Sequence, residues 1–406
     1  MSSRIVGAVG FAATMSALTL GVLTPHASDA AGQQPLPPIA CAIAPDRDVP
    51  IKAVLGRQIS CGLDLGSRTA KLSVVSMVPG SRATVREERV CRRTLGMGAQ
   101  VFEAASKTAR PLPPASIDSL SATIQAFRTI CQADRGTIVS AGATQWARDA
   151  TNIAEVKARV NAATGIDFDV LSPAQEAAFG YIAGSVNTPG RIVLDPGSNS
   201  FQISWQPKSG GQIQSVLVEY GYVRASTADF EPAADYAGAI AAYRAKAKSQ
   251  IATALARLSP PTDVTMLASH VRSGVLGPDL ISLGQDGAVH WFVRGALRDD
   301  GSWIADAKAY DARVAAPTLL PDRGFGVMAS PPIQLSDLQA FIRTLGPADF
   351  QALKSDPIKG IYGQRALVTP VLMDLLMSEL GLRRLIIVPQ EIATGQILAR
   401  MDKPAR

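Results

Sequence analysis

The chain is poor in the residues that mark several classes of protein. Only three of its 406 residues are histidine, four are cysteine and 5% are aromatic. The cysteines lack the Cys-x-x-Cys spacing of zinc and redox sites, and no Gly-x-Ser-x-Gly segment indicates a serine nucleophile. No run of five or more like charges is present. A histidine-based metal centre, a serine hydrolase and a nucleic-acid-binding protein are therefore disfavoured.

What the chain does have is enough apolar sequence for two or three domains. Apolar residues make up 47% of it, and its formal net charge is +6. A mildly basic balance is compatible with a polyanionic ligand, although surface composition alone also explains it.

The first 30 residues have the features of a signal peptide. Arg4 is followed by an uncharged stretch from Ile5 to Leu23, and Ser28 and Ala30 are the small residues that precede a cleavage site. We therefore predict a periplasmic or secreted protein with no membrane span after cleavage. An uncleaved N-terminal anchor is the alternative, because the uncharged stretch nearly reaches the length that spans a bilayer.

Export would place all four cysteines in an oxidising compartment, where two disulfides are expected and three pairings are possible. The favoured pairing joins Cys41 to Cys61, because this bond would fasten the proline-rich arm at 31–50 to the first core strand. The alternative is four buried free thiols. The remaining cysteines are Cys91 and Cys131.

The order of the expected elements is that of an α/β protein with two domains. Residues 51–186 would form the first domain and 187–406 the second, with a hinge near 187–190. Residues 274–330 read as a small β-rich insertion, which would serve as a lid or as an inert surface elaboration. Strands are expected at 59–65, 70–78, 84–94, 137–140, 168–171 and 385–388, and helices at 116–133, 151–164, 174–183 and 367–380.

Two segments of the chain are near-copies of one another. Gly62 to Ser67 and Leu194 to Ser200 each read as a buried strand that ends in an acid, Asp64 or Asp195, followed by a glycine-serine turn. The free backbone N–H groups of such a turn bind anions, and the acid suits a metal that accompanies phosphate. Carboxylates that accept N–H bonds within an ordinary Asx turn are the alternative.

In order and spacing these motifs resemble the exopolyphosphatase and guanosine pentaphosphate phosphohydrolase (Ppx/GppA) family, within the actin-like superfamily. The resemblance implies two actin-like α/β domains flanking a cleft. Four blocks carry it: Asp64-Leu65-Gly66-Ser67-Arg68-Thr69; Ala143 to Arg148 with Val170 to Ala177; Asp195-Pro196-Gly197-Ser198-Asn199-Ser200 with Glu219 to Arg224; and Gly363 to Ala366 with Thr394-Gly395-Gln396.

The resemblance also implies roles for individual residues. Glu176 matches the family's catalytic glutamate, and its place at the start of a helix would lower its pKa and keep it ionised as a base. Arg148 matches an arginine that reaches the phosphates, and Asp64 and Asp195 would hold Mg²⁺. The alternatives are a Glu176 that only caps its helix together with Ser172 and arginines that only form surface contacts. The phosphate-binding positions would be Gly66, Ser67, Arg68, Thr69, Gly197, Ser198, Asn199, Ser200 and Arg365.

The chain departs from the family pattern in three places. Ser198 and Asn199 replace two glycines of the second turn, and Gln202 replaces a glutamate. Ala268-Ser269-His270 stands where a Gly-Gly-Thr-like turn is expected after a strand at 264–267, which argues against nucleotide recognition. Gln175 replaces the first of two consecutive glutamates.

The sequence thus predicts an exported, Mg²⁺-dependent phosphatase that acts on the terminal anhydride of polyphosphate, or on another phosphorylated small molecule. The alternative is a protein of the same fold that binds or senses such a ligand without turnover. A homodimer is expected by resemblance only.

Overall fold

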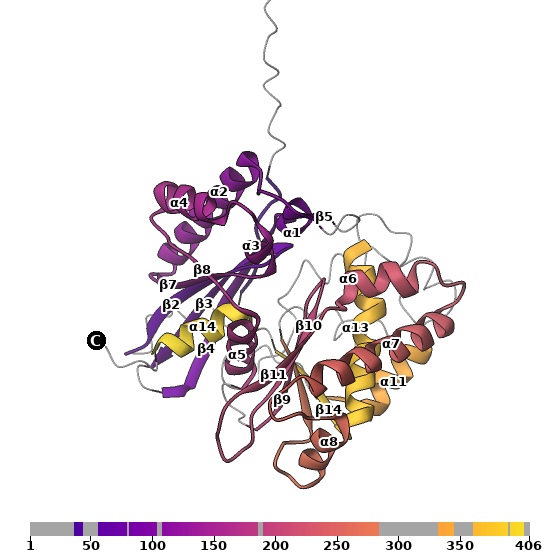
Figure 1. Cartoon of the computed structure of the whole chain (residues 1–406). Coiled ribbons are helices and arrows are strands. Elements are labelled where there is room, and N and C mark those ends of the chain that lie inside the picture. Colours follow the sequence, from indigo (N-terminus) through magenta and orange to yellow (C-terminus); the bar gives the residue numbers. More distant parts are fainter. Residues whose placement is uncertain are drawn as a thin grey trace, which may run out of the picture. The chain divides into compact units, whose positions relative to one another are not determined.

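The computed structural model describes residues 36–43, 56–78, 81–103, 108–185, 190–283, 332–344, 360–388 and 390–401. The predicted signal peptide, most of the arm and most of the predicted insertion lie outside these residues. The described part is a mixed α/β structure with two six-stranded sheets (Figure 1), which confirms the predicted α/β class.

The first sheet has the strand order β1-β4-β3-β2-β7-β8. Apolar side chains of β2 and β3 are almost wholly buried because helices cover both faces of the sheet. The strands are β1 (Ala40–Ile43), β2 (Gln58–Leu65), β3 (Thr69–Val78), β4 (Ser81–Thr94), β7 (Thr137–Ala143) and β8 (Asp169–Val170). A separate small hairpin consists of β5 (Phe102–Glu103) and β6 (Thr108–Ala109).

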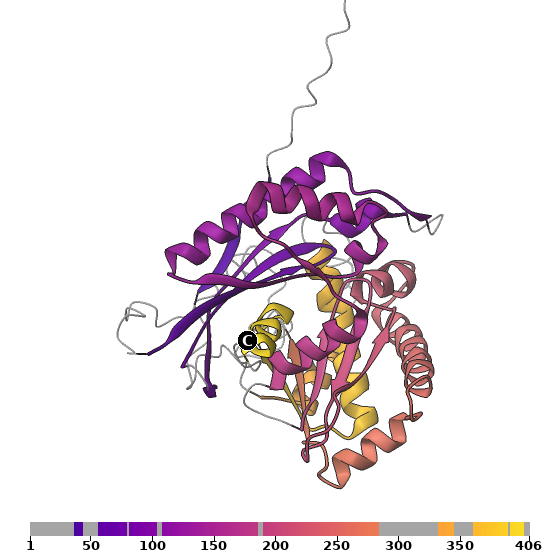
Figure 2. The same ribbon diagram turned by 60° about the vertical axis from the view of Figure 1, so that its left-hand side comes forward.

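Helices α2 (Pro114–Ala133) and α4 (Ile153–Thr164) lie on one face of the first sheet, and α14 (Ile392–Met401) lies on the other (Figures 1 and 2). The buried residues of α2 include Ile117, Leu120, Ile124 and Phe127, so the predicted amphipathic helix is confirmed. Two short helices, α1 (Met97–Val101) and α3 (Gln145–Asp149), also belong to this part.

The second sheet has the order β11-β10-β9-β12-β14-β13, in which β9, β12 and β14 are parallel. Its strands are β9 (Ile192–Pro196), β10 (Phe201–Trp205), β11 (Gln214–Val218), β12 (Asp279–Leu283), β13 (Ile333–Gln334) and β14 (Arg384–Val388). The helices of this part are α5 (Pro173–Ser185), α6 (Tyr222–Ala225), the π-helix η2 (Ser226–Phe230), α7 (Tyr236–Ala256), α8 (Val264–Arg272), α11 (Leu335–Thr344) and α13 (Gly360–Leu380).

Helix α14 crosses between the two sheets. It follows β14 of the second sheet yet packs on β2, β3 and β7 of the first. Gly395 of α14 lies directly against the backbone of Phe179 in α5, where any Cβ would clash. The end of the predicted second domain therefore contributes to the core of the first.

Two details differ from the sequence prediction. The expected strand at 264–267 is the start of helix α8, because the Asp263 side chain accepts a hydrogen bond from Met266 N (2.7 Å) and caps the helix. Residues 279–283, predicted to lie in the insertion, form the buried central strand β12. All five of its residues are buried, as in a parallel strand covered on both faces.

Both disulfides differ from the favoured pairing. Cys41 in β1 lies directly opposite Cys91 in β4 and is bonded to it. Cys61 in β2 is bonded to Cys131 in α2. The arm is fastened to the sheet as expected, but through β4 rather than β2. The alternative of four free thiols is wrong in this structure.

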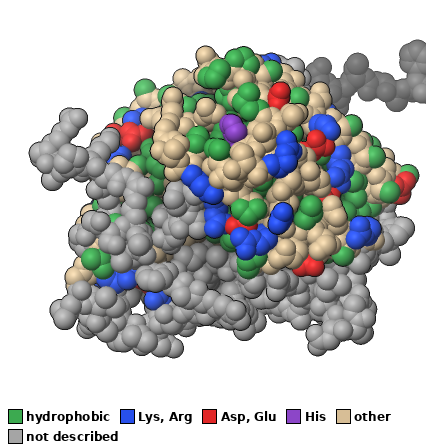
Figure 3. Space-filling view, turned by 90° about the horizontal axis from the view of Figure 1, so that it is seen from below, with side chains coloured by type: hydrophobic (Ala, Val, Ile, Leu, Met, Phe, Trp, Pro, Cys, Tyr) green, Lys and Arg blue, Asp and Glu red, His purple; other side chains and the backbone are tan. Residues whose placement is uncertain are grey.

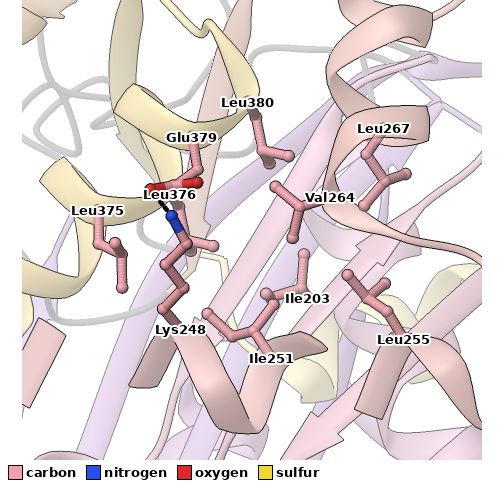
Figure 4. Close-up of a pocket in the computed structure, with 10 residues that line it drawn as sticks. All are labelled: Ile203, Lys248, Ile251, Leu255, Val264, Leu267, Leu375, Leu376, Glu379 and Leu380. Carbon is pink, nitrogen blue, oxygen red and sulfur yellow. Dashed lines mark hydrogen bonds and ion pairs between the residues drawn. The ribbon is translucent and has the colours of Figure 1, made fainter. Parts of the chain in front are cut away.

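The helices over the second sheet leave a small apolar pocket (Figure 4). Its only charged lining residues are Lys248 and Glu379, which pair at 2.7 Å. Such a lining does not suit a phosphorylated ligand. No described helix is both long and apolar enough to cross a membrane.

Candidate functional site

The two near-copies in the sequence are equivalent hairpins in the structure. In the first, Asp64 of β2 lies opposite Lys71 of β3. In the second, Asp195 of β9 lies opposite Gln202 of β10. Each acid is thus followed seven residues later by its cross-strand neighbour, which is cationic in one hairpin and neutral in the other.

Lys71 is the centre of a charged cluster. Its Nζ lies 3.2 Å from Asp64 Oδ2 and 2.6 Å from Glu391 Oε2. The other oxygen of Glu391 lies 3.1 Å from Arg92 Nη2. Glu391 immediately precedes α14, so this cluster ties the segment after β14 to strands β3 and β4 of the first sheet.

Glu176 lies in the first turn of α5. Its side chain does not cap the helix, so the alternative role given to it from the sequence is wrong. Gln175 makes the cap instead: Gln175 N donates to Ser172 Oγ (3.2 Å), and Ser172 N donates to Gln175 Oε1 (2.9 Å). The Gln175 side chain is therefore engaged in a capping box with Ser172. This arrangement leaves the Glu176 carboxylate available to other groups.

The Glu176 carboxylate pairs with Arg148. Arg148 Nη1 lies 3.1 Å from Glu176 Oε2 and also donates to the carbonyl of Leu171, while Nη2 donates to Gln145 Oε1 (2.8 Å). The two side chains are only 14% (Glu176) and 19% (Arg148) exposed. The predicted phosphate-contacting arginine is thus held beside the predicted base.

The predicted direction of the Glu176 pKa is wrong. Burial raises the pKa of Glu176 to about 7, and the opposing effect of Arg148 is smaller. A neighbouring negative charge on Asp64 raises it further. Loss of solvation thus changes the pKa of Glu176 more than the position at the start of the helix does. A general base is most effective when its pKa lies near the working pH, and a pKa of about 7 meets this condition at neutral pH.

The three predicted acids share one electrostatic environment. Burial raises the pKa of Asp195 to about 7, and the charges of Glu176, Glu391 and Asp64 act in the same direction while Lys71 opposes them. Burial likewise raises the pKa of Asp64, against the effect of Lys71. Acids from β2, α5 and β9 therefore converge on the same region, as the duplicated turns predict.

Asp64 offers a feature that fits a cation. It is 3% exposed, and its Oδ1 has no hydrogen-bond partner in the described part of the chain. No group of three or more His, Cys, Asp or Glu residues among the described positions is arranged to hold a metal. Two carboxylates nonetheless suit Mg²⁺, which usually takes one or two protein carboxylates and completes its shell with water and substrate phosphates.

The two turns differ in their free donors. Gly66 N donates to Thr69 O (3.1 Å), so this predicted phosphate donor is already used to close the first turn. The N–H groups of Ser67, Gly197 and Ser198 make no hydrogen bond within the described residues. These three remain candidates for phosphate binding.

The other predicted positions lie around the turns or outside the described side chains. Arg68 O accepts from Leu95 and Gly96, which places this residue within the first turn, and Thr69 begins β3. In the second turn Asn199 is exposed and Ser200 half-buried. Arg365 lies in α13, but its side chain is outside the described residues.

Sequence reasoning missed Lys71 and Glu391. The signal for Lys71 was present, because the same seven-residue offset that singles out Gln202 after Asp195 leads from Asp64 to Lys71. Glu391 gives no such signal, since it lies 320 residues from Lys71 and meets it only through the packing of α14.

Comparison with known proteins points to one family for part of the chain. Residues 95–268 match the sequence model of the Ppx/GppA phosphatase family. Over this range the chain is similar to the Ppx/GppA phosphatases. The matched range includes Arg148, Glu176 and Asp195. A search of curated proteins found no match.

Solved structures of Ppx/GppA proteins share the fold. A family member from Aquifex aeolicus superposes with a TM-score of 0.57 at 14% identity, covering 85% of this chain and 97% of that one. An exopolyphosphatase from Cytophaga hutchinsonii gives 0.54 at 13% identity, covering 85% and 98%. An exopolyphosphatase-like protein gives 0.58 at 15% identity, also covering 85% and 98%. The protein therefore has the two-sheet actin-like architecture of these proteins.

Proposed function

We propose that the protein hydrolyses the terminal phosphoanhydride bond of inorganic polyphosphate. The observation that carries the proposal is the buried Glu176 carboxylate, whose pKa of about 7 lies in the range of an effective base and whose neighbours are Arg148, Asp64 and Asp195. The similarity of residues 95–268 to the Ppx/GppA phosphatases supports phosphoanhydride hydrolysis as the class of reaction.

In the proposed reaction Glu176 accepts a proton from the attacking water. The oxygen of this water forms a bond to the terminal phosphorus as the bridging P–O bond breaks, and the shortened chain departs with the bridging oxygen. Arg148 beside Glu176 holds the carboxylate in place and supplies positive charge near the reacting phosphoryl group. The N–H groups of Ser67, Gly197 and Ser198 bind phosphate oxygens.

Lys71 supplies a second positive charge. Its ammonium is held by Asp64 and Glu391 and is 24% exposed, so it can approach a phosphate oxygen without losing both carboxylates. Glu391 is in turn held by Arg92. We assign Lys71 to phosphate binding and Glu391 to the positioning of Lys71.

We assign Mg²⁺ to Asp64 and Asp195. The unpaired Oδ1 of Asp64 fits a cation, and bound Mg²⁺ would neutralise charge on the phosphate oxygens. The site of action is proposed to be periplasmic or extracellular, on the basis of the N-terminal sequence alone.

A phosphate-release assay tests the proposal. Purified protein is incubated with long-chain polyphosphate and Mg²⁺, and free phosphate is measured beside direct binding of the polymer. The proposal requires release that is lost in Glu176→Gln while binding persists. Binding without release in the wild type would overturn it in favour of a sensing protein.

A further inference from the structure

We propose that a second surface of the protein binds the distal part of a long polyphosphate chain. This surface, the distal basic surface, consists of Arg191, Lys208, Arg272, Arg383 and Arg384. It lies where the parallel strands of the second sheet begin, whereas Asp195 lies where β9 ends. The identification of the ligand as polyphosphate rests on the proposed function, whereas the positive charge of the surface follows from its own residues.

Backbone hydrogen bonds bring the segments of this surface together. Lys208 N donates to Val275 O (3.2 Å), which joins the turn after β10 to the loop after α8. Gly277 N donates to Gly190 O (2.8 Å), and Arg383 N donates to Pro278 O (2.8 Å). Four segments that are distant in sequence therefore form one continuous edge.

The edge carries a strong excess of positive charge. Across residues 190–191, 206–213, 268–279 and 381–385 there are five cations and one acid. That acid, Asp279, is 1% exposed and is paired with both Arg191 and Arg384. One buried charge cannot neutralise two arginines.

The other three cations of the edge are open to a ligand. Lys208, Arg272 and Arg383 are exposed, and within the described part of the chain their side chains have no hydrogen-bond or ion-pair partner. Figure 3, which views the molecule from the side of α8, shows Lys and Arg side chains gathered on this face. Guanidinium groups bind phosphate oxygens in a bidentate manner.

The position of this surface implies a dependence on chain length. Asp195 lies four residues along the chain from Arg191, and at about 3.3 Å per residue in β9 their backbones are about 13 Å apart. A short phosphate ester held at the Asp195 end cannot reach Arg191 and its neighbours. A long linear polyanion can occupy both, which would raise its affinity without any change in the chemical step.

The experiment compares Arg272→Ala/Arg383→Ala with a charge-matched control, Arg135→Ala/Arg343→Ala, in the full chain. Binding of long-chain polyphosphate and of tripolyphosphate is measured over a range of salt concentrations, beside phosphate release from tripolyphosphate. We expect the first variant to bind long chains more weakly and to lower the slope of log Kd against log salt by about 1 to 2. Its tripolyphosphate binding and turnover stay at the wild-type level, and the control matches the wild type throughout.

Equal long-chain affinity and slope in both variants would overturn the proposal. A third measurement uses vesicles that contain anionic phospholipid. If Arg272→Ala/Arg383→Ala alone loses vesicle binding and its polyphosphate binding is unchanged, the surface is assigned to a membrane instead. A wild-type protein that binds long chains through this surface but releases no phosphate would contradict the proposed hydrolysis and leave the surface assignment standing.

Discussion

Arg148 Nη1 lies 3.1 Å from Glu176 Oε2, and neither residue caps a helix or faces open solvent. This pair gives the predicted base a fixed orientation. It also sets two opposing effects on the same carboxylate, since burial raises the pKa of Glu176 and Arg148 lowers it. The result of these two effects is a Glu176 pKa of about 7. Helices α3 and α5, which carry Arg148 and Glu176, thus hold the carboxylate in the state that the proposed reaction needs.

Replacement of Glu176 should remove catalysis without loss of the fold. We expect Glu176→Gln to lower the rate of phosphate release by about 10² to 10⁴, the usual contribution of a general base. The matched control is its neighbour, where Gln175→Ala removes the acceptor of Ser172 N but keeps the bond from the residue-175 N–H to Ser172 Oγ, and costs at most about 1 kcal/mol of stability while activity remains. Equal loss of activity in both variants would mean that α5 as a whole, and not the carboxylate, is required.

Lys71 and Glu391 should act as a unit on substrate affinity. We expect Lys71→Met to raise the KM for polyphosphate and Glu391→Gln to change the same constant, because Glu391 acts through Lys71 Nζ at 2.6 Å. In the Lys71→Met background, Glu391→Gln should then have little further effect on kcat/KM. Additive effects across this double-mutant cycle would show that Glu391 serves only to dock α14.

Glu87 should make stability depend on pH. Burial raises its pKa to about 8 against an ordinary value of 4.5, and Thr394 Oγ1 donates to it from α14 (2.7 Å). A raised pKa in the folded state means that this group stabilises most below pH 4.5 and loses that contribution as the pH rises to 8. Glu87→Gln should therefore flatten the fall in unfolding free energy over this window, measured by urea titration. Parallel curves for variant and wild type would contradict the assignment.

The disulfides should be detectable as two independent cross-links. Non-reducing peptide mapping should join Cys41 to Cys91 and Cys61 to Cys131. Cys41→Ser/Cys91→Ser should lower the unfolding free energy by about 2 to 4 kcal/mol, because it frees a loop of 50 residues. Peptides that join Cys41 to Cys61 would contradict the structure.

Local patterns were sufficient to predict much of the first sheet and the amphipathic helix α2. The duplicated turns also led to Asp64 and Asp195, and the helix expected at 174–183 is α5. Each of these features depends on residues that are close together in the chain, so a local sequence pattern is enough to predict it.

Features that depend on distant residues were beyond the sequence. One error was local instead: the segment 264–267 was read as a strand although Asp263 directly before it caps a helix, because short apolar runs do not separate the two states. The disulfide partners depend on strand order, which places β1 beside β4. The pKa of Glu176 depends on how completely its surroundings exclude water, and local helix position gave the opposite sign.

The pH dependence of kcat/KM for polyphosphate tests the central claim most directly. The account predicts activity that rises through pH 7 as Glu176 loses its proton, and an acid limb that moves to higher pH in Arg148→Met, because loss of the cation raises the pKa of the base. Arg128→Met, which removes an arginine bonded to the Thr164 carbonyl, should leave the limb in place. An acid limb that stays unchanged in Arg148→Met would contradict the assignment of Glu176 as the base.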